Sequence, residues 1–328
     1  MAKIVNVVVV DLTRPVEQKG FKSVALIDCT KVKEASTISD VKGLDGQLAT
    51  VASSYFGNGG GYLVVAGVDC SASSDGKELK ALLEKTLVSN PFYGLTLIMP
   101  VAKQKVLLKV AKEFCEGNEL LCVTELLGEK DTIKTDTQDL NSDRVAVFAS
   151  KAENENYTGL GSGVCGMGFP QDEGSLTWAN KVITGVPLSK YTLAEELELQ
   201  ESNVNYLTNV LGFNITQFGR TLSGSNIDIT RSKDYLKNRI AETLTSTLVN
   251  SKKIPFTSRG LAQISSALDT VGIQAINQGM LETYQAVLPN IDEIPATDKA
   301  NRVLKNVKFI AQLSGAIETI DLELQIVL

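Results

Sequence analysis

From Ile320 onward the chain alternates between apolar and polar side chains. A period of two predicts a β-strand with one buried face. Near the other end, 4–10 is apolar and β-branched except for Asn6. Because an apolar strand with an open edge tends to pair with another chain, we expect a neighbouring chain to complete both ends. The residues expected in these arms are Ile4, Val5, Val7, Val8, Val9, Val10, Ile320, Leu322, Leu324, Ile326 and Leu328.

Between the arms, the first part of the chain alternates short apolar runs with segments of helical periodicity. Strands are expected over 1–12, 23–28, 62–68, 95–99, 120–124 and 144–149. Helices are expected over 41–52, from Ser73 or Ser74 to Asn90, and over 101–115. Strands that alternate with amphipathic helices predict an α/β sheet that is at least partly parallel.

The second part of the chain mixes helical and extended patterns. Helices are expected over 194–211 and 232–250 and from Thr257 or Ser258, a hairpin over 213–219 and 226–230, and a strand over 303–312. The predicted fold class is therefore α/β and α+β, a mixed sheet flanked by helices, with extended terminal β-strand arms. The expected divisions are an N-terminal arm (1–20), an α/β domain (21–200), an α+β domain (201–302) and a C-terminal strand and arm (303–328).

Charge and hydropathy exclude two classes of partner. The net charge of the 328 residues is −6, which argues against nucleic acid because phosphate binding needs a basic surface. No apolar run approaches the roughly 20 residues that a membrane helix needs. The start, Met1-Ala2-Lys3, is unlike a signal peptide, so we expect synthesis in the cytosol.

The chain contains no histidine, which removes the commonest general base and transition-metal ligand. The five cysteines are odd in number and form no C-x-x-C pair, so we interpret them as core residues. They are Cys29, Cys70, Cys115, Cys122 and Cys165. We therefore predict no catalytic, cofactor-binding or metal-binding residues. An enzyme that uses carboxylate or lysine chemistry remains the alternative.

Two glycine-rich segments could in principle bind phosphate. Gly161, Gly163 and Gly166 match G-x-G-x-x-G, but the polar stretch 151–158 precedes them where a strand is required. We interpret this segment as a flexible connector. The run 56–61 leads from a helix into a strand, so a helix C-cap and turn explain it.

Several polar groups have an ordinary structural explanation. Aspartates beyond strand ends commonly form turns, which is the interpretation for Asp11, Asp28, Asp69 and Asp75. The acidic helix face of Glu195, Glu196, Glu198 and Glu201 is expected to be solvated. Trp178, the single tryptophan, is expected in the core or at an interface. A basic surface for an acidic partner, or simple solubility, explains Lys252, Lys253 and Arg259.

Five short segments follow one another in a recognisable order. They are Tyr-Phe-Gly-Asn-Gly-Gly at 55–60 before apolar 62–65, Gly-Ser-Leu-Thr-Trp-Ala at 174–179, Asn-Val-Asn-Tyr at 203–206, Ile-Asp-Ile-Thr-Arg at 227–231, and Lys-Ile-Pro-Phe-Thr-Ser-Arg-Gly at 253–260. In this order they resemble the contractile tail sheath proteins of bacteriophages and related injection machines. The shared order of the segments supports the resemblance more strongly than any single segment does.

The resemblance implies an assembly protein without enzymatic activity or cofactor. Sheath subunits stack as hexameric rings around an inner tube, lend both arms to neighbours as strands, and contract to drive the tube through a target envelope. The implied partners are other copies, the tube protein, and baseplate and tail terminator proteins, in a virion assembled in the host cytoplasm. Lys252, Lys253 and Arg259 would then face the tube. A tube or baseplate component remains a structural alternative.

Overall fold

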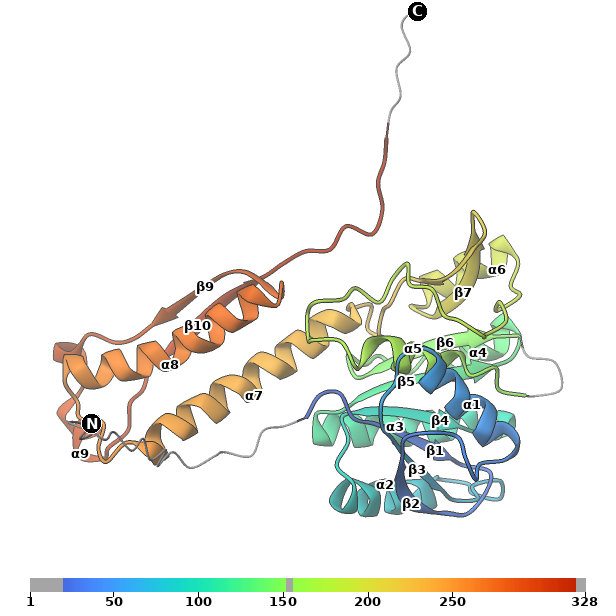
Figure 1. Ribbon diagram of the computed structural model, residues 1–328, viewed down its shortest axis with the longest axis horizontal. Helices are drawn as coiled ribbons and strands as arrows, with labels where there is room; N and C mark the ends of the chain where they lie inside the picture. The colour runs from blue at the N-terminus through green and yellow to red at the C-terminus, as the bar shows by residue number, and fades with distance from the viewer. Residues whose placement is uncertain (1–19, 152–155, 323–328) are drawn as a thin grey trace, which may run out of the picture. The chain divides into compact units, whose positions relative to one another are not determined.

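A computed structural model of the protein describes residues 20–151 and 156–322, which form two compact units (Figure 1). We call Gly20–Asp234, together with the segment from Gly315 onward, the sheet unit. We call Tyr235–Ser314 the helix–hairpin unit. The boundary between them falls inside one long helix, so a continuous element belongs to both.

The sheet unit is built on eight strands in the order β2-β3-β1-β4-β5-β6-β7-β8. They are β1 (Val24–Asp28), β2 (Lys33–Ile38), β3 (Leu63–Gly67), β4 (Gly94–Ile98), β5 (Leu121–Leu127), β6 (Val145–Ser150), β7 (Asn205–Val210) and β8 (Phe213–Gln217). The pairs β2-β3 and β7-β8 are antiparallel, and the others are parallel. The strands β1 and β3–β6 are buried along their whole length, as is typical of parallel strands covered on both faces.

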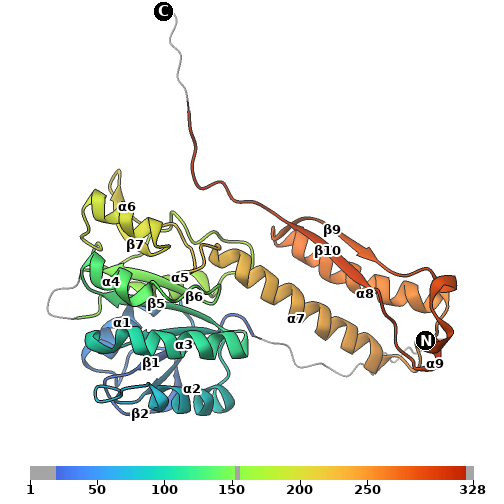
Figure 2. The same ribbon diagram turned by 180° about the vertical axis from the view of Figure 1, so that it is seen from behind.

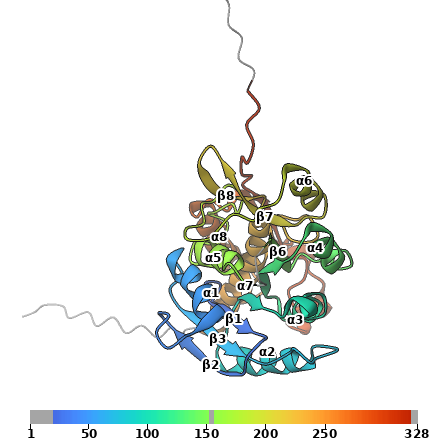
Figure 3. The same cartoon turned by 90° about the vertical axis from the view of Figure 1, so that its right-hand side faces the viewer.

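Helices supply that cover. They are α1 (Gly46–Gly57), α2 (Lys77–Ser89), α3 (Gln104–Asn118), α4 (Lys130–Thr137), α5 (Leu160–Gly168) and α6 (Leu193–Glu201), with a short 3-10 turn at Val101–Lys103. Figure 3 shows α1 and α5 on one side of the sheet and α3 and α4 on the other. From behind, α2 and α3 lie in front of the strands (Figure 2).

The helix–hairpin unit contains most of α7 and a small sheet. Its elements are α7 (Ile227–Asn250), α8 (Ser258–Asn277), β9 (Leu281–Val287), a 3-10 turn (Ile291–Glu293), α9 (Ala296–Ala300) and β10 (Lys308–Leu313). β9 and β10 pair antiparallel, and α8 packs on β9 with one apolar face. The ring of Tyr284 stacks on Phe309, with 5.5 Å between centroids. Gly272 of α8 leaves the space that this tyrosine ring fills.

The predicted α/β sheet is confirmed, but three local predictions differ. The helix expected over 194–211 ends at Glu201, because Asn203 adopts a left-handed φ of 56° and the chain continues as β7. The strand expected at 226–230 is instead the first turn of α7. The hairpin expected between 213–219 and 226–230 is wrong, because β8 pairs instead with β7 around a turn at Leu211 and Gly212.

The compact units also differ from the expected divisions. We expected the second domain to begin at 201, whereas the sheet unit extends to Asp234. The reason is that β7 joins the parallel sheet through β6, with Phe148 opposite Asn205. The strand expected over 303–312 is present as β10, at Lys308–Leu313.

Little of the predicted arms falls within the described residues. Ile320 and Leu322 follow the last strand, have no strand assignment up to residue 322, and are 82% and 81% exposed. The N-terminal set Ile4–Val10 and the C-terminal Leu324, Ile326 and Leu328 lie outside the described residues. Arm pairing therefore stays a prediction.

Candidate functional site

The carboxyl edge of the parallel strands is where α/β proteins commonly bind ligands. Here the protein's own side chains fill that edge beyond β4 and β5. The Tyr157 hydroxyl accepts a hydrogen bond from the Met99 N–H and donates one to the Met99 carbonyl, both at 3.0 Å. The Gln104 side chain donates to the Leu127 carbonyl at 2.9 Å and accepts from its N–H at 2.7 Å. These satisfied polar contacts close the edge at this point instead of leaving polar groups for a substrate.

The segment that matches G-x-G-x-x-G is helix α5, so the interpretation as a flexible connector is wrong. A nucleotide would place its pyrophosphate at the helix N-terminus. That position already holds the buried carboxylate of Glu125, which accepts hydrogen bonds from the N–H groups of Gly159 and Leu160, each at 3.0 Å. Burial raises the pKa of Glu125. The helix N-terminus thus has an internal carboxyl group in place of a phosphate.

The three motif glycines allow α5 to pack closely on its neighbours. A Cβ on Gly166 would lie 2.1 Å from the carbonyl oxygen of Tyr55 in α1, and one on Gly161 would lie 2.5 Å from the backbone nitrogen of Glu125. Close approach between backbones explains Gly161 and Gly166, whereas a Cβ on Gly163 would lie 2.5 Å from the Ser54 hydroxyl. The run at 56–61 is the expected helix end and turn, with Gly59 at a φ of 102°.

The remaining candidate chemical groups within the described residues have structural roles, and Asp11 lies outside those residues. The carboxylates of Asp28, Asp69 and Asp75 each accept a hydrogen bond from the N–H two residues ahead, which confirms the turn interpretation for these three. All five cysteines are buried and unbridged, and Trp178 is buried in the core. Within 20–151 and 156–322, no three Cys, Asp or Glu side chains gather closely enough to share a metal ion.

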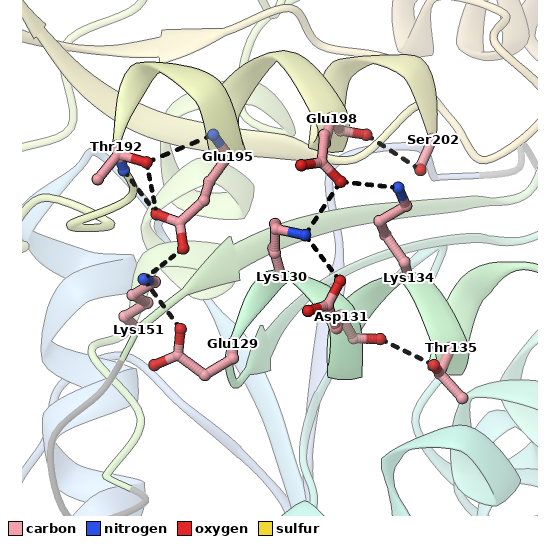
Figure 4. Close-up of polar contacts among 10 residues, drawn as sticks. All are labelled: Glu129, Lys130, Asp131, Lys134, Thr135, Lys151, Thr192, Glu195, Glu198 and Ser202. Carbon is pink, nitrogen blue, oxygen red and sulfur yellow. Dashed lines mark hydrogen bonds and ion pairs between the residues drawn. The ribbon is translucent and has the colours of Figure 1, made fainter.

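The acidic face of α6 forms ion pairs, so the expectation that it is merely solvated is wrong for two of its residues (Figure 4). Glu195 contacts Lys151 at 2.8 Å, and Glu198 contacts both Lys130 at 3.0 Å and Lys134 at 3.1 Å. The Lys151 ammonium lowers the pKa of Glu195 to about 2, with help from the capping residue Thr192. These pairs link α6 to α4 and to the end of β6.

The first two turns of α7 are fixed to the sheet unit by buried charged groups that sequence analysis missed. Asp234 accepts from Tyr93 at 2.6 Å and forms a two-point ion pair with Arg144. The guanidinium of Arg231 donates to the Gly168 carbonyl at 3.0 Å and lies over the ring of Phe169. The available signal was Arg231, directly before the helix predicted over 232–250, and Asp234, three positions later in that helix.

A groove of about 690 Å³ lies in the helix–hairpin unit. Part of its lining is apolar, including Ile254, Pro255, Phe256, Leu261, Ile264 and Leu304. Four cations also line it, namely Lys252, Lys253, Lys299 and Arg302. The structure thus brings together two of the three predicted basic residues and adds two distant in sequence. Arg259 is not one of the lining residues.

The small sheet of the same unit is open. In the described part of the chain, β9 pairs with β10 alone, so each strand has an unpaired outer edge. β10 is exposed or half-buried throughout, and Ile310 is 54% exposed. Further exposed apolar residues of this unit are Leu248, Val249, Ile273, Ile276 and Val303. A two-stranded sheet with open edges and apolar side chains is suited to accept further strands.

The described helices include none that is long and apolar enough to cross a membrane. No curated protein matches the chain in sequence. Residues 227–284 match the family model "E217 tail sheath protein gp31-like, C-terminal domain". This match covers all of α7 and α8 and the start of β9.

Solved structures resemble the chain over its whole length. A chain of the anti-feeding prophage baseplate has a TM-score of 0.72 at 15% identity, with 100% of both chains covered. A chain of the contracted helical sheath of the same particle has a TM-score of 0.71 at 14% identity and 99% coverage of each chain. A chain of the contracted PVC sheath complex, an extracellular contractile injection system, has 0.68 at 14%, covering 99% of this chain and 98% of that one. The resemblance to contractile tail sheath proteins is therefore confirmed: residues 227–284 match a tail sheath C-terminal domain, and the whole chain has the fold found in these sheath and baseplate structures.

Proposed function

We propose that the protein is the repeating subunit of a contractile sheath. It would stack as hexameric rings around an inner tube and contract to drive that tube through a target envelope. The observation that supports this most is the open β9–β10 sheet, in a unit that matches a tail sheath domain, within a chain that has apolar arms at both ends. The particle would form in the cytoplasm of the producing cell and include baseplate and tail terminator proteins.

The arms would connect subunits by strand addition. Main-chain hydrogen bonds would link an arm to an open sheet edge, and the alternating apolar side chains would fix the register. Ile320 and Leu322 are more than four-fifths exposed within their own chain, so they are available to a neighbour. Burial of one such side chain is worth about 1.5–3 kcal/mol. Five per C-terminal arm, repeated over many subunits, would keep the lattice connected while the compact units move.

The basic groove would meet the inner tube. Lys252, Lys253 and Arg302 have no carboxylate within ion-pair distance among residues 20–151 and 156–322. Such a surface suits an acidic partner, and the apolar residues in its lining would exclude water from the contact. Of the predicted tube-facing residues, Lys252 and Lys253 fit this surface better than Arg259.

Charge reversal tests the tube contact. The double variant Lys252→Glu/Lys253→Glu should lose co-assembly with tube protein, whereas Arg259→Glu, outside the groove, should retain most of it. Equal co-assembly by both variants and the wild type would remove the groove from the tube interface.

Negative-stain microscopy tests the assembly itself. The full chain should form tubes of stacked rings. A deletion of 320–328 should leave a folded protein that forms no tubes. This deletion keeps Glu318, which accepts from Thr177 at 3.1 Å and from Asn180 at 2.9 Å and so belongs to the sheet unit. Ordered sheaths from the deleted protein would contradict the arm linkage.

The same images separate the alternatives. A tube component would give thin tubes, and an enzyme would give discrete particles with a ligand-dependent melting shift. The protein's own side chains fill the carboxyl edge beyond β4 and β5, which argues against a substrate site at that point. The likeness to a baseplate chain supports a second alternative, in which the protein lies next to the baseplate. Rings that bind baseplate proteins but do not stack would favour this alternative.

A further inference from the structure

The turn between β7 and β8 has an unusual sequence for its geometry. Val210 pairs with Phe213, so Leu211 and Gly212 alone form the loop. Their φ angles are 51° and 90°, both positive, as a type I′ turn requires. Such turns favour Asn-Gly, because asparagine tolerates a positive φ, whereas leucine is strained there. The chain therefore keeps a leucine where asparagine would fold better.

Leu211 gains nothing from its own chain in return for this strain. Its side chain is 95% exposed, and the flanking Val210 and Phe213 are 44% and 63% exposed. The sequence from 204 to 219 contains no charged residue. The end of the ribbon is thus an apolar tip formed by Val210, Leu211 and Phe213, which we call the hairpin tip.

The hairpin tip is held in a defined shape. The Asn209 side chain accepts a hydrogen bond from the Gly212 N–H at 3.2 Å and donates one across the ribbon to the Asn214 carboxamide at 2.7 Å. A braced turn loses little conformational entropy when it binds, so it is suited to present an exposed side chain to a partner.

The contact formed by the tip would be made by side chains rather than by strand addition. The outer edge of β8 is already covered at Thr216, whose N–H donates to the Lys181 carbonyl at 2.8 Å and whose carbonyl accepts from the Asn180 N–H at 2.9 Å. A further strand has no room there. This separates the tip from the arms, for which main-chain pairing is expected.

We propose that the hairpin tip inserts into an apolar pocket of a second copy of this chain. The inference rests on the proposed sheath function. Three side chains bury on the order of a few hundred Å², well below the roughly 1,200 Å² of a stable independent complex. A contact this small is effective only when other links already hold the partners together, as in a polymer of identical subunits. A tip on one copy and a pocket on the next is a heterologous contact, which propagates as rings or helices.

The substitution Leu211→Asn separates folding from assembly, because it moves them in opposite directions. Relief of strain should raise the melting temperature by roughly 2 °C. Loss of the apolar tip should reduce the amount of sedimentable polymer at least tenfold. The matched control is Val88→Asn on α2, since Val88 is also apolar and 86% exposed, and it should polymerise as the wild type does.

Normal polymerisation by Leu211→Asn would overturn the inference while leaving the proposed sheath function intact. A wild-type chain that forms no polymer would contradict the sheath function, and this inference with it. A photo-crosslinking amino acid at 211 identifies the occupant. Covalent dimers of the chain in assembled material support a second copy, and crosslinks to the tube or another protein instead would overturn it.

Discussion

The two units of this protein bury their strands very differently. In the sheet unit, β1 and β3–β6 are buried at every residue, because helices cover both faces of the parallel strands. In the helix–hairpin unit, β10 has no buried residue and β9 has one, Leu281. The first unit completes its own core. Within the described residues, the second unit exposes sheet edges and apolar side chains. Partners that cover these groups would stabilise the unit further.

This division suits a subunit that must move without unfolding. A two-stranded sheet is marginal by itself, and added strands or a helix stabilise it. α8 supplies one such cover through Ile264, Leu268 and Val271. Added strands from neighbouring copies would supply the rest. Contacts between subunits would then form through the helix–hairpin unit. These contacts could change or persist without any unfolding of the sheet unit.

The largest expected effect concerns the buried charge at the start of α7. Replacement of Arg231 by methionine leaves Glu173 and several carbonyl groups unpaired in the sheet unit, which should cost about 3–5 kcal/mol of unfolding free energy. The measurement is urea denaturation followed by circular dichroism. The matched change Arg259→Met, on the exposed first turn of α8, should stay within about 0.5 kcal/mol. A similar loss of unfolding free energy in both variants would mean that Arg231 contributes no more than an exposed arginine. That result would contradict the contrast between the two units.

A smaller effect is expected from packing of α5 on α1. In Gly166→Ala the new methyl meets the Tyr55 carbonyl, so one of the helices must shift, at about 1–3 kcal/mol. At Gly57, in α1 itself, a new methyl would have no heavy atom within 4 Å, and Gly57→Ala should be neutral or slightly stabilising. Thermal melts of both variants test this. An unchanged melt for Gly166→Ala would mean that the α1–α5 contact is loose.

The smallest effect is electrostatic. The pKa of Glu195 is about 2 in the folded protein, below its unfolded value of about 4.3. The stabilisation is therefore complete above about pH 4.3 and is lost as the pH falls through 2. Because both side chains are partly exposed to solvent, salt should screen the pair. Carboxyl NMR titration should give a pKa near 2 at low salt and a higher one in Lys151→Met. A value near 4.3 in the unaltered protein would show that the pair does not form in solution.

The apolar pattern predicted the parallel strands β1 and β3–β6 and the helices α1–α3, because these elements leave a local signal, but it did not predict β2, α4, α5 or β7. Val24–Asp28 and Leu63–Gly67 each form a short apolar run, and both are buried strands. The errors occur where a distant contact decides the structure. α5 looked like a connector because nothing near Gly161 in the sequence announces that Glu125, on β5, caps the helix.

The candidate surfaces were predictable in part for the same reason. Lys252 and Lys253 were visible as a basic pair, but their neighbours in the groove, Lys299 and Arg302, come from α9 and the turn after it. The hairpin tip was missed because the periodicity of 194–211 suggested a helix through Leu211. The positive φ of Leu211 is a property of the backbone that the hydrophobic pattern does not indicate.

Hydrogen exchange of β9–β10, measured before and after assembly, tests the central claim most directly. We predict that amides of Leu281–Val287 and Lys308–Leu313 exchange rapidly in the isolated subunit and become strongly protected in the polymer. Amides of β1, β4 and β5 should be slow in both states. Protection of β9–β10 that is already complete in the isolated subunit, or that does not change in the polymer, would contradict the claim that neighbouring copies complete this unit.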